Sequence, residues 1–278
     1  MKSFKIILFQ IILFSSYYSF GQDKSSLEIE KKSPFTIGET LTVHSNILNE
    51  DRVLNIYLPN GYSTDSLKKY PVIYLLDGSV DEDFIHISGL VQFGSFSWIK
   101  LLPETIVVGI SNIDRRRDYT FPTTIKKDKE DFPTTGGSEK FIQFIADELQ
   151  PLIEHHYLLS DSKTIIGQSL GGLLATEILL KKPELFDRYI IVSPSLWWDN
   201  ESLLKFSLPK NNDVKEIFVG VGKEGKVMES DAKALFDKLQ MEKTKSTKTY
   251  FDFLPAQDHA DALHLAVYHA FEKMFKIK

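Results

Sequence analysis

One stretch of the sequence decides the fold, Lys163-Thr164-Ile165-Ile166-Gly167-Gln168-Ser169-Leu170-Gly171-Gly172. Its apolar start is typical of a buried strand, and the apolar residues 173–180 that follow are typical of a helix. Between them, Gly167 and Gly171 flank Ser169 and remove Cβ atoms that would collide in a sharp strand-to-helix turn. The pattern predicts a strained Ser169 whose hydroxyl is exposed above the strand ends, near the positive end of a helix dipole.

Apolar runs of strand length recur along the chain, at residues 71–76, 105–110, 164–166, 189–192, 216–221 and 249–254. Segments with helical spacing lie between or after them, at residues 141–153, 170–180, 230–239 and 262–275. Strands without polar alternation are typical of a parallel sheet that helices cover on both faces. We therefore predict an α/β fold with a mostly parallel central sheet of about eight strands.

Two segments differ from this pattern. Residues 41–45 and 52–59 alternate between polar and apolar, with the turn-forming Asn49-Glu50-Asp51 between them, and predict an antiparallel hairpin at the N-terminal side of the sheet. Residues 115–137 are charged and rich in Pro, Thr and Gly. We expect them to form an exposed loop over one end of the sheet.

Composition excludes several classes of function. The chain has 278 residues, of which 42% are hydrophobic and 26% charged, as in a folded globular protein. A net charge of −5 gives no electrostatic reason to bind nucleic acid. The absence of cysteine excludes disulfides, thiolate metal sites and a cysteine nucleophile. No motif indicates a metal or an organic cofactor; we interpret His155-His156 as structural, with a metal site as the minor alternative.

The N-terminus resembles a targeting segment. Basic residues at 1–5, an apolar run at 6–14 and the small residues of Ser19-Phe20-Gly21 predict a signal peptide over 1–21, a tether over 22–34 and a folded domain over 35–278. A membrane anchor is the alternative, but the apolar run is shorter than the roughly 20 residues that span a bilayer. We expect a periplasmic or secreted protein without stable membrane insertion after cleavage.

A serine nucleophile needs a base to take its proton. Where a Gly-x-Ser-x-Gly turn carries the serine, the acid and then the base follow it along the chain. His259 lies in the loop between the last strand and the last helix, where its side chain can reach over the strand ends. His264 and His269 also satisfy the order, but they lie within the helix and are interpreted as structural.

The acid is expected after the strand at 216–221. Glu224 is the first carboxylate in the loop Gly222-Lys223-Glu224-Gly225 and is our first choice. Glu229 and Asp231 remain alternatives, because acids at the start of a helix also serve its dipole.

Two further groups of residues are candidates for the site. Donors for an oxyanion are expected from the backbone N–H of Leu170 and of Ser79, with Gly78 as the alternative to Ser79. Trp197 and Trp198 follow the strand at 189–192, where ligands bind open parallel sheets. They are interpreted as substrate-binding, with a packed corner as the alternative.

Five stretches together resemble a known family, the bacterial putative esterases of the α/β-hydrolase fold. They are Tyr74-Leu75-Leu76-Asp77-Gly78, Val108-Gly109-Ile110-Ser111-Asn112-Ile113-Asp114-Arg115-Arg116-Arg117-Asp118-Tyr119, Gly167-Gln168-Ser169-Leu170-Gly171-Gly172, Ser193-Pro194-Ser195-Leu196-Trp197-Trp198 and Asp258-His259. The resemblance runs from Asp51 to the C-terminus. The second and fourth stretches are most similar to the branch that includes the ferric-siderophore (trilactone) esterases.

The resemblance implies an α/β-hydrolase fold and carboxylic-ester hydrolysis through an acyl-serine intermediate, with Ser169 and His259 as the catalytic pair. It also implies that Arg115, Arg116 or Arg117 contacts an anionic substrate, a salt-bridged arginine run being the alternative.

We therefore predict a secreted serine esterase that acts on a small-molecule ester such as a siderophore lactone or an aromatic or sugar ester. Two alternatives stay open: an acyltransferase that uses the same acyl-serine, and a non-catalytic binding protein with a hydrolase fold. No feature of the sequence indicates an oligomeric state.

Overall fold

The computed structural model describes residues 27, 29–210 and 212–275. The chain divides into two units, Met1–Phe35 and Thr36–Lys278, and the second contains the elements described below. The predicted signal peptide and residues 22–26 and 28 of the predicted tether lie outside the described residues, so these boundaries stay predictions. Within the described part, no helix is both long and apolar enough to cross a bilayer.

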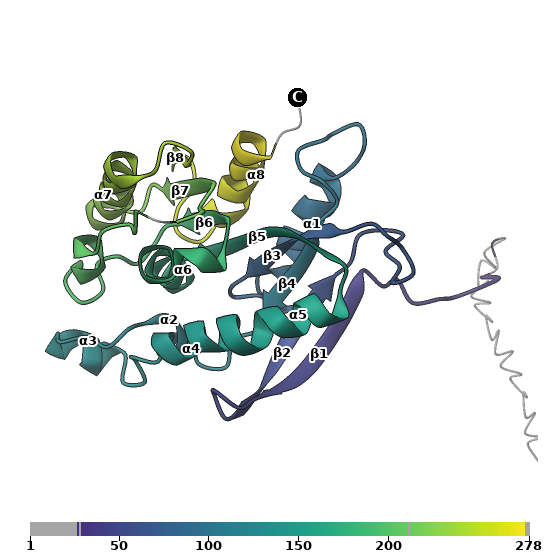
Figure 1. Ribbon diagram of the computed structural model, residues 1–278, viewed down its shortest axis with the longest axis horizontal. Coiled ribbons are helices and arrows are strands. Elements are labelled where there is room, and N and C mark those ends of the chain that lie inside the picture. Colours follow the sequence, from purple (N-terminus) through teal and green to yellow (C-terminus); the bar gives the residue numbers. More distant parts are fainter. Residues whose placement is uncertain (1–26, 28, 211, 276–278) are drawn as a thin grey trace, which may run out of the picture. The chain divides into compact units, whose positions relative to one another are not determined.

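A mixed sheet forms the centre of the Thr36–Lys278 unit, in the order β1-β2-β4-β3-β5-β6-β7-β8 (Figure 1). Its strands are β1 (Gly38–Ser45), β2 (Glu50–Tyr57), β3 (Tyr70–Leu75), β4 (Ile106–Ile110), β5 (Leu159–Gln168), β6 (Arg188–Val192), β7 (Glu216–Gly222) and β8 (Lys248–Leu254). β2 pairs antiparallel with β1 and with β4, and every other pair is parallel. The predicted α/β class, with about eight strands and an N-terminal hairpin, is confirmed.

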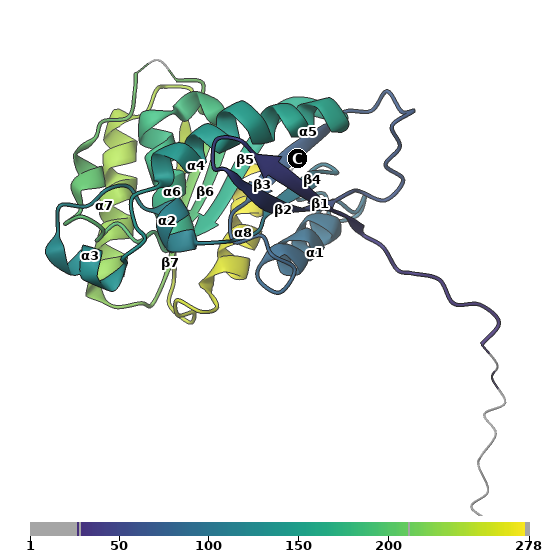
Figure 2. The same cartoon turned by 90° about the horizontal axis from the view of Figure 1, so that it is seen from below.

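Helices cover both faces of the sheet. They are α1 (Phe84–Gly94), α2 (Arg115–Tyr119), α3 (Lys126–Asp131), α4 (Ser138–Phe144), α5 (Gln150–His156), α6 (Leu170–Lys181), α7 (Lys226–Glu242) and α8 (Ala262–Met274), and a π-helical turn, Ile145–Leu149, joins α4 to α5. α1 and α8 pack on one face, while α4, α5, α6 and α7 pack on the other (Figure 2).

The strands divide their side chains between two cores. On β3, Val72 and Tyr74 pack toward the face of α4 to α7, whereas Ile73 and Leu75 pack toward α1 and α8. This explains the runs without alternation, because both faces of a central strand are buried. β8 differs, since most of its residues are half-buried or exposed. The expectation of full burial is wrong there because β8 is the edge strand.

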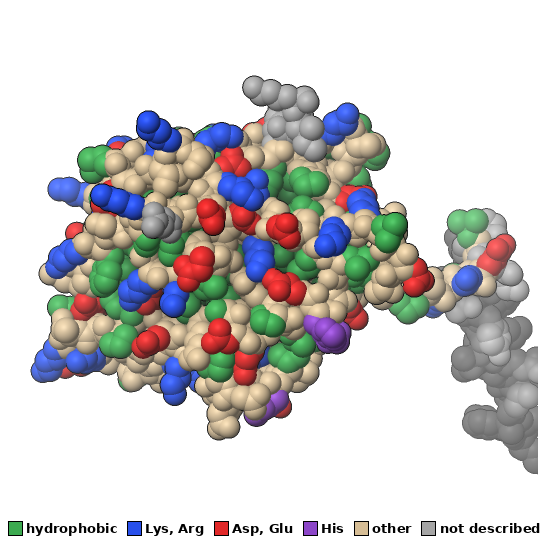
Figure 3. Space-filling view, viewed as in Figure 1, with side chains coloured by type: hydrophobic (Ala, Val, Ile, Leu, Met, Phe, Trp, Pro, Cys, Tyr) green, Lys and Arg blue, Asp and Glu red, His purple; other side chains and the backbone are tan. Residues whose placement is uncertain are grey.

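Two local predictions are corrected. The hairpin turn lies at residues 46–49, and Glu50 and Asp51 already belong to β2. The segment 115–137 is not simply an exposed loop, since it contains α2 and α3 and buries residues 118–121. Its charges are partly neutralised inside the fold, because Asp118 pairs with Arg52 and Arg117. On the face drawn in Figure 3, basic and acidic side chains are interspersed rather than segregated.

Candidate active site

Ser169 lies on the turn between β5 and α6. Its φ of 58° and ψ of −119° place it in a region that non-glycine residues rarely adopt. A Cβ atom on Gly167 would lie 2.4 Å from the carbonyl oxygen of Gly171. The predicted strained turn and the need for glycine at this position are therefore confirmed.

His259 and Glu224 meet above the ends of β7 and β8. Glu224 Oε2 lies 2.5 Å from Nδ1 of His259, and the other carboxylate oxygen accepts hydrogen bonds from the Gly222 N–H and the Ser193 hydroxyl. The Glu224 side chain is only 2% exposed. Burial alone would raise the pKa of Glu224, but these hydrogen bonds outweigh it and lower the pKa from its usual value. The Nδ1 atom of His259 is thus occupied by Glu224.

The alternative acids and bases make other contacts. Glu229 accepts a hydrogen bond from the Gly225 N–H at 2.9 Å, and Asp231 is buried on α7. The histidines of α8 are also engaged elsewhere, because His264 contacts the ring of His86 and His269 pairs with Asp252. Among the candidates, Glu224 is the carboxylate that the structure brings to His259.

Two clefts share Ser169, His259 and Ala260 in their walls. The tryptophan cleft, of about 690 Å³, is completed by Ser195, Trp197, Lys223, Glu224, Met228 and Asp258. The acidic cleft, of about 400 Å³, is completed by Asp77, Glu82, Asp83, Arg115 and Gln168. The hydroxyl of Ser169 lies 3.3 Å from that of Ser195, while His259 Nδ1 pairs with Glu224. The structure therefore places Ser169 and His259 in the walls of the same clefts, although Ser169 hydrogen-bonds to Ser195 and His259 to Glu224.

A cleft of about 720 Å³ lies elsewhere, with α4 and α6 residues in its walls, and contains none of the predicted site residues. The volume of a cleft alone therefore does not identify the candidate active site. Within the described residues, no cluster of three His, Cys, Asp or Glu side chains is placed to hold a metal ion.

The loop after β3 carries the two candidates, Gly78 and Ser79, for one of the expected oxyanion donors. The N–H of Gly78 donates to the Ile110 carbonyl at 3.0 Å, so this alternative is not available. No hydrogen bond from the N–H of Ser79 is present among the described residues. The N–H of Leu170 belongs to the first turn of α6, where N–H groups have no partner within the helix. These positions leave Ser79 and Leu170 as the available pair.

Arg115 is partly exposed and forms an ion pair with Asp77. Its Nε and Nη2 donate to the two oxygens of Asp77 at 2.8 and 2.9 Å. Asp77 has a φ of 55°, and its backbone N–H donates to the Tyr119 hydroxyl at 3.0 Å. Arg115 thus holds the start of the loop that carries Ser79.

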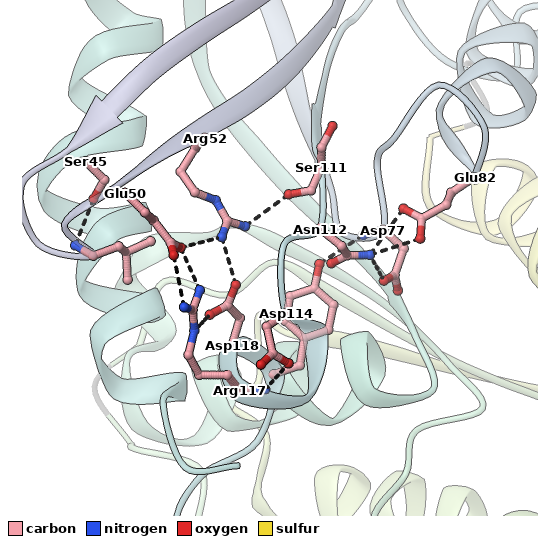
Figure 4. Close-up of polar contacts among 12 residues, drawn as sticks. Ser45, Glu50, Arg52, Asp77, Glu82, Ser111, Asn112, Asp114, Arg117 and Asp118 are labelled. Atoms are coloured by element: carbon pink, nitrogen blue, oxygen red, sulfur yellow. Dashed lines mark hydrogen bonds and ion pairs between the residues drawn. The ribbon is translucent and has the colours of Figure 1, made fainter. Parts of the chain in front are cut away.

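Arg117 forms ion pairs within the fold, so its contact with substrate stays a prediction. Its guanidinium pairs with Glu50 and Asp118, and Asp118 also binds the fully buried Arg52 (Figure 4). This network joins the N-terminal hairpin to α2. Arg116 lies over the ring of Phe132.

The two tryptophans have different environments. Trp198 is 0% exposed, and its indole N–H donates to the Phe121 carbonyl at 2.9 Å. The prediction that Trp198 contacts substrate is therefore wrong, because its side chain is fully buried in a packed corner of the fold. Trp197 is half-buried and lines the tryptophan cleft.

Sequence reasoning missed three polar residues of the site. Ser193, with a φ of 44°, donates to Glu224, and Ser195 lies beside Ser169. Gln168 Nε2 donates to the His259 carbonyl at 2.7 Å and holds its loop. Polar residues at the carboxyl end of a buried strand were the available signal, since Ser193 and Ser195 follow β6 and Gln168 ends β5.

Known proteins match this sequence and fold. The family model described as "Putative esterase" matches residues 45–273. Ferri-bacillibactin esterase BesA of Bacillus subtilis is 30% identical over 84% of this chain and 88% of its own length. The crystal structure of an IroE-like serine hydrolase from Shewanella oneidensis is 30% identical, with a TM-score of 0.75 over 86% of this chain and 80% of that one.

A third match is the BES protein from Bacillus cereus, with 27% identity and a TM-score of 0.76 over 90% of this chain and 100% of that one. The chain belongs to this esterase family of serine hydrolases, in the siderophore esterase branch. Its fold is of the α/β-hydrolase type, as the resemblance implied.

Proposed function

We propose that this protein is a secreted serine carboxylic-ester hydrolase that acts through an acyl-serine intermediate. The observation that carries the proposal is the strained Ser169, which shares two clefts with a His259 already paired to a buried Glu224. A serine held at a helix start and an imidazole oriented by a carboxylate are the parts that acyl transfer requires.

In the first step, Ser169 Oγ attacks the ester carbonyl carbon while His259 Nε2 takes the hydroxyl proton. The N–H groups of Leu170 and Ser79 stabilise the oxyanion of the tetrahedral intermediate. Its collapse breaks the bond to the alcohol oxygen, which receives the proton from His259. A water molecule then gives a proton to His259 and attacks the acyl-serine, and release of the carboxylic acid returns the proton to Ser169.

We propose a siderophore lactone, or a similar aromatic ester, as the substrate class. The siderophore branch of the family and the indole of Trp197 beside Ser169 support this choice. An aromatic acyl group could pack on that indole while its ester carbonyl lies at Ser169.

The test of the chemistry uses three proteins and one active-site probe. Ser169→Ala is expected to lose hydrolysis of a short p-nitrophenyl ester and labelling by a fluorophosphonate, with an unchanged melting temperature. Ser195→Ala, which removes the neighbouring hydroxyl, is expected to keep the label. Full activity in Ser169→Ala would overturn the proposal, as would labelling of a different residue by mass spectrometry.

The proposed secretion rests on the basic and apolar pattern of residues 1–21. The mass of the protein exported by a bacterial host is expected to correspond to a chain that begins at Gln22. Recovery of the chain from the cytoplasm with Met1 intact would contradict this proposal.

A further inference from the structure

The walls of the acidic cleft carry an excess of carboxylates on one side of Ser169. Asp77, Glu82 and Asp83 line it, and Arg115 is its one basic lining residue besides His259. Arg115 already donates two hydrogen bonds to Asp77. Of the three arginines that the family resemblance offered for contact with an anionic substrate, Arg115 is the one that lines this cleft, and its charge is neutralised by Asp77.

The two remaining carboxylates, Glu82 and Asp83, interact with Arg115 only at longer range. Among the residues that the structure describes, Glu82 accepts hydrogen bonds only from the neutral amide of Asn112, at 3.2 Å to each oxygen. Figure 4 shows this amide between Glu82 and Asp77. Among the described residues, no Lys or Arg forms an ion pair with Glu82 or Asp83. The field at this side of Ser169 is negative.

The pKa of Asp83 reflects this negative field. Burial, together with the charges of Asp77 and Glu82, raises the pKa of Asp83 to about 6. A carboxylate whose surroundings disfavour its ionised form destabilises the folded state when it ionises. Residues with such perturbed pKa values are concentrated at ligand-binding sites.

The tryptophan cleft, on the other side of Ser169, does not carry an excess of positive charge. Lys223 lines the tryptophan cleft, but Glu224 and Asp258 lie there with it. Acidic residues therefore outnumber Lys and Arg in both clefts.

On the basis of the proposed esterase function, we propose that the acidic cleft selects esters whose adjoining groups are uncharged or cationic, and rejects polyanionic ones. Among siderophore esters, the preferred substrate is then the uncharged, iron-free ligand. The iron(III) complex of three catecholate dianions is a trianion and would meet Glu82 and Asp83 at close range. Electrostatic complementarity of this kind affects the choice between substrates more than the rate of the chemical step.

The experiment compares kcat/KM for charge-matched esters. Three phenyl esters of equal length carry an acyl chain that ends in trimethylammonium, tert-butyl or sulfonate, and a tricatecholate trilactone is supplied iron-free and iron-loaded. At low ionic strength, the sulfonate ester and the iron-loaded trilactone are each expected to react at least about ten-fold more slowly than their uncharged partners.

The variant Glu82→Gln/Asp83→Asn is expected to reduce the discrimination between uncharged and anionic esters by about ten-fold. Asp65→Asn removes one exposed carboxylate before β3, at the other end of the sheet, and is expected to leave every ratio unchanged. Equal or faster reaction of the anionic esters with the wild-type protein would overturn the inference, as would an unchanged ratio in the double variant. Loss of all ester hydrolysis would instead contradict the proposed function, so the two failures are distinguishable.

Discussion

The carboxylate of Glu224 lies 2.5 Å from Nδ1 of His259, although 35 residues separate them in the chain. β7 and β8 are adjacent and parallel, with Gly222 opposite Leu254 at their carboxyl ends. The two loops that follow these strands therefore leave the same edge of the sheet. The Ser193 hydroxyl, which follows the next strand β6, holds the other oxygen of Glu224.

Replacement of this carboxylate tests its proposed role. Glu224→Gln is expected to lower kcat for a p-nitrophenyl ester by about 10²-fold or more, because a neutral amide does not stabilise the imidazolium that forms during the reaction. Glu229→Gln is the matched control, since Glu229 binds the Gly225 N–H and not His259. Comparable kcat values in the two variants would contradict the assignment.

Substitutions of the two adjacent tryptophans are expected to have different effects, one on stability and the other on substrate binding. Trp198→Ala removes a fully buried side chain and is expected to lower the free energy of unfolding by about 3–5 kcal/mol. Trp197→Ala is expected to raise KM for aromatic esters with a smaller effect on stability, because Trp197 lines the cleft of Ser169. Urea unfolding and steady-state kinetics measure the two effects, and the reverse pattern would show that the roles are exchanged.

Arg115 and Arg117 of α2 allow a second comparison between an effect on catalysis and an effect on stability. Arg115→Gln is expected to lower kcat by about ten-fold, because Asp77 would lose two charged hydrogen bonds that hold the loop of Ser79. Arg117→Gln is expected to leave kcat unchanged.

The effect of Arg117→Gln should be on stability instead. It is expected to lower the free energy of unfolding by about 1–3 kcal/mol, because it removes one partner of the buried Asp118. A loss of kcat in Arg117→Gln without loss of stability would argue against the structural role.

The ionisation of Asp83 predicts a pH-dependent stability. Its pKa is raised to about 6 from 3.8, so the ionised form destabilises the native state. This destabilisation is fully present above pH 6 and disappears as the pH falls toward 3.8. Asp83→Asn is therefore expected to raise the melting temperature at about pH 8 and to lose that advantage at about pH 4. A constant difference across this range would mean that the carboxylate is not the cause.

Much of the fold could be predicted because its signals are local. The runs that became β3 to β7 are apolar on consecutive residues, as strands covered on both faces must be. The turn at Ser169 was also readable, since only a residue without Cβ fits at Gly167 beside the Gly171 carbonyl. The segment 115–137 was misread because its charges resemble those of a solvated loop, while Asp118 and Arg117 are paired inside the fold.

The class of fold, the strained serine and the loops in which an acid and a base could lie all follow from local sequence patterns. Those are properties of neighbouring residues, and backbone sterics and side-chain periodicity settle them. Three findings needed the three-dimensional arrangement of the chain: Glu224 and not Glu229 meets His259, Arg115 binds Asp77, and Trp197 lines the cleft while Trp198 is buried. Such choices depend on distances between loops from different strands, which the order and packing of the strands establish.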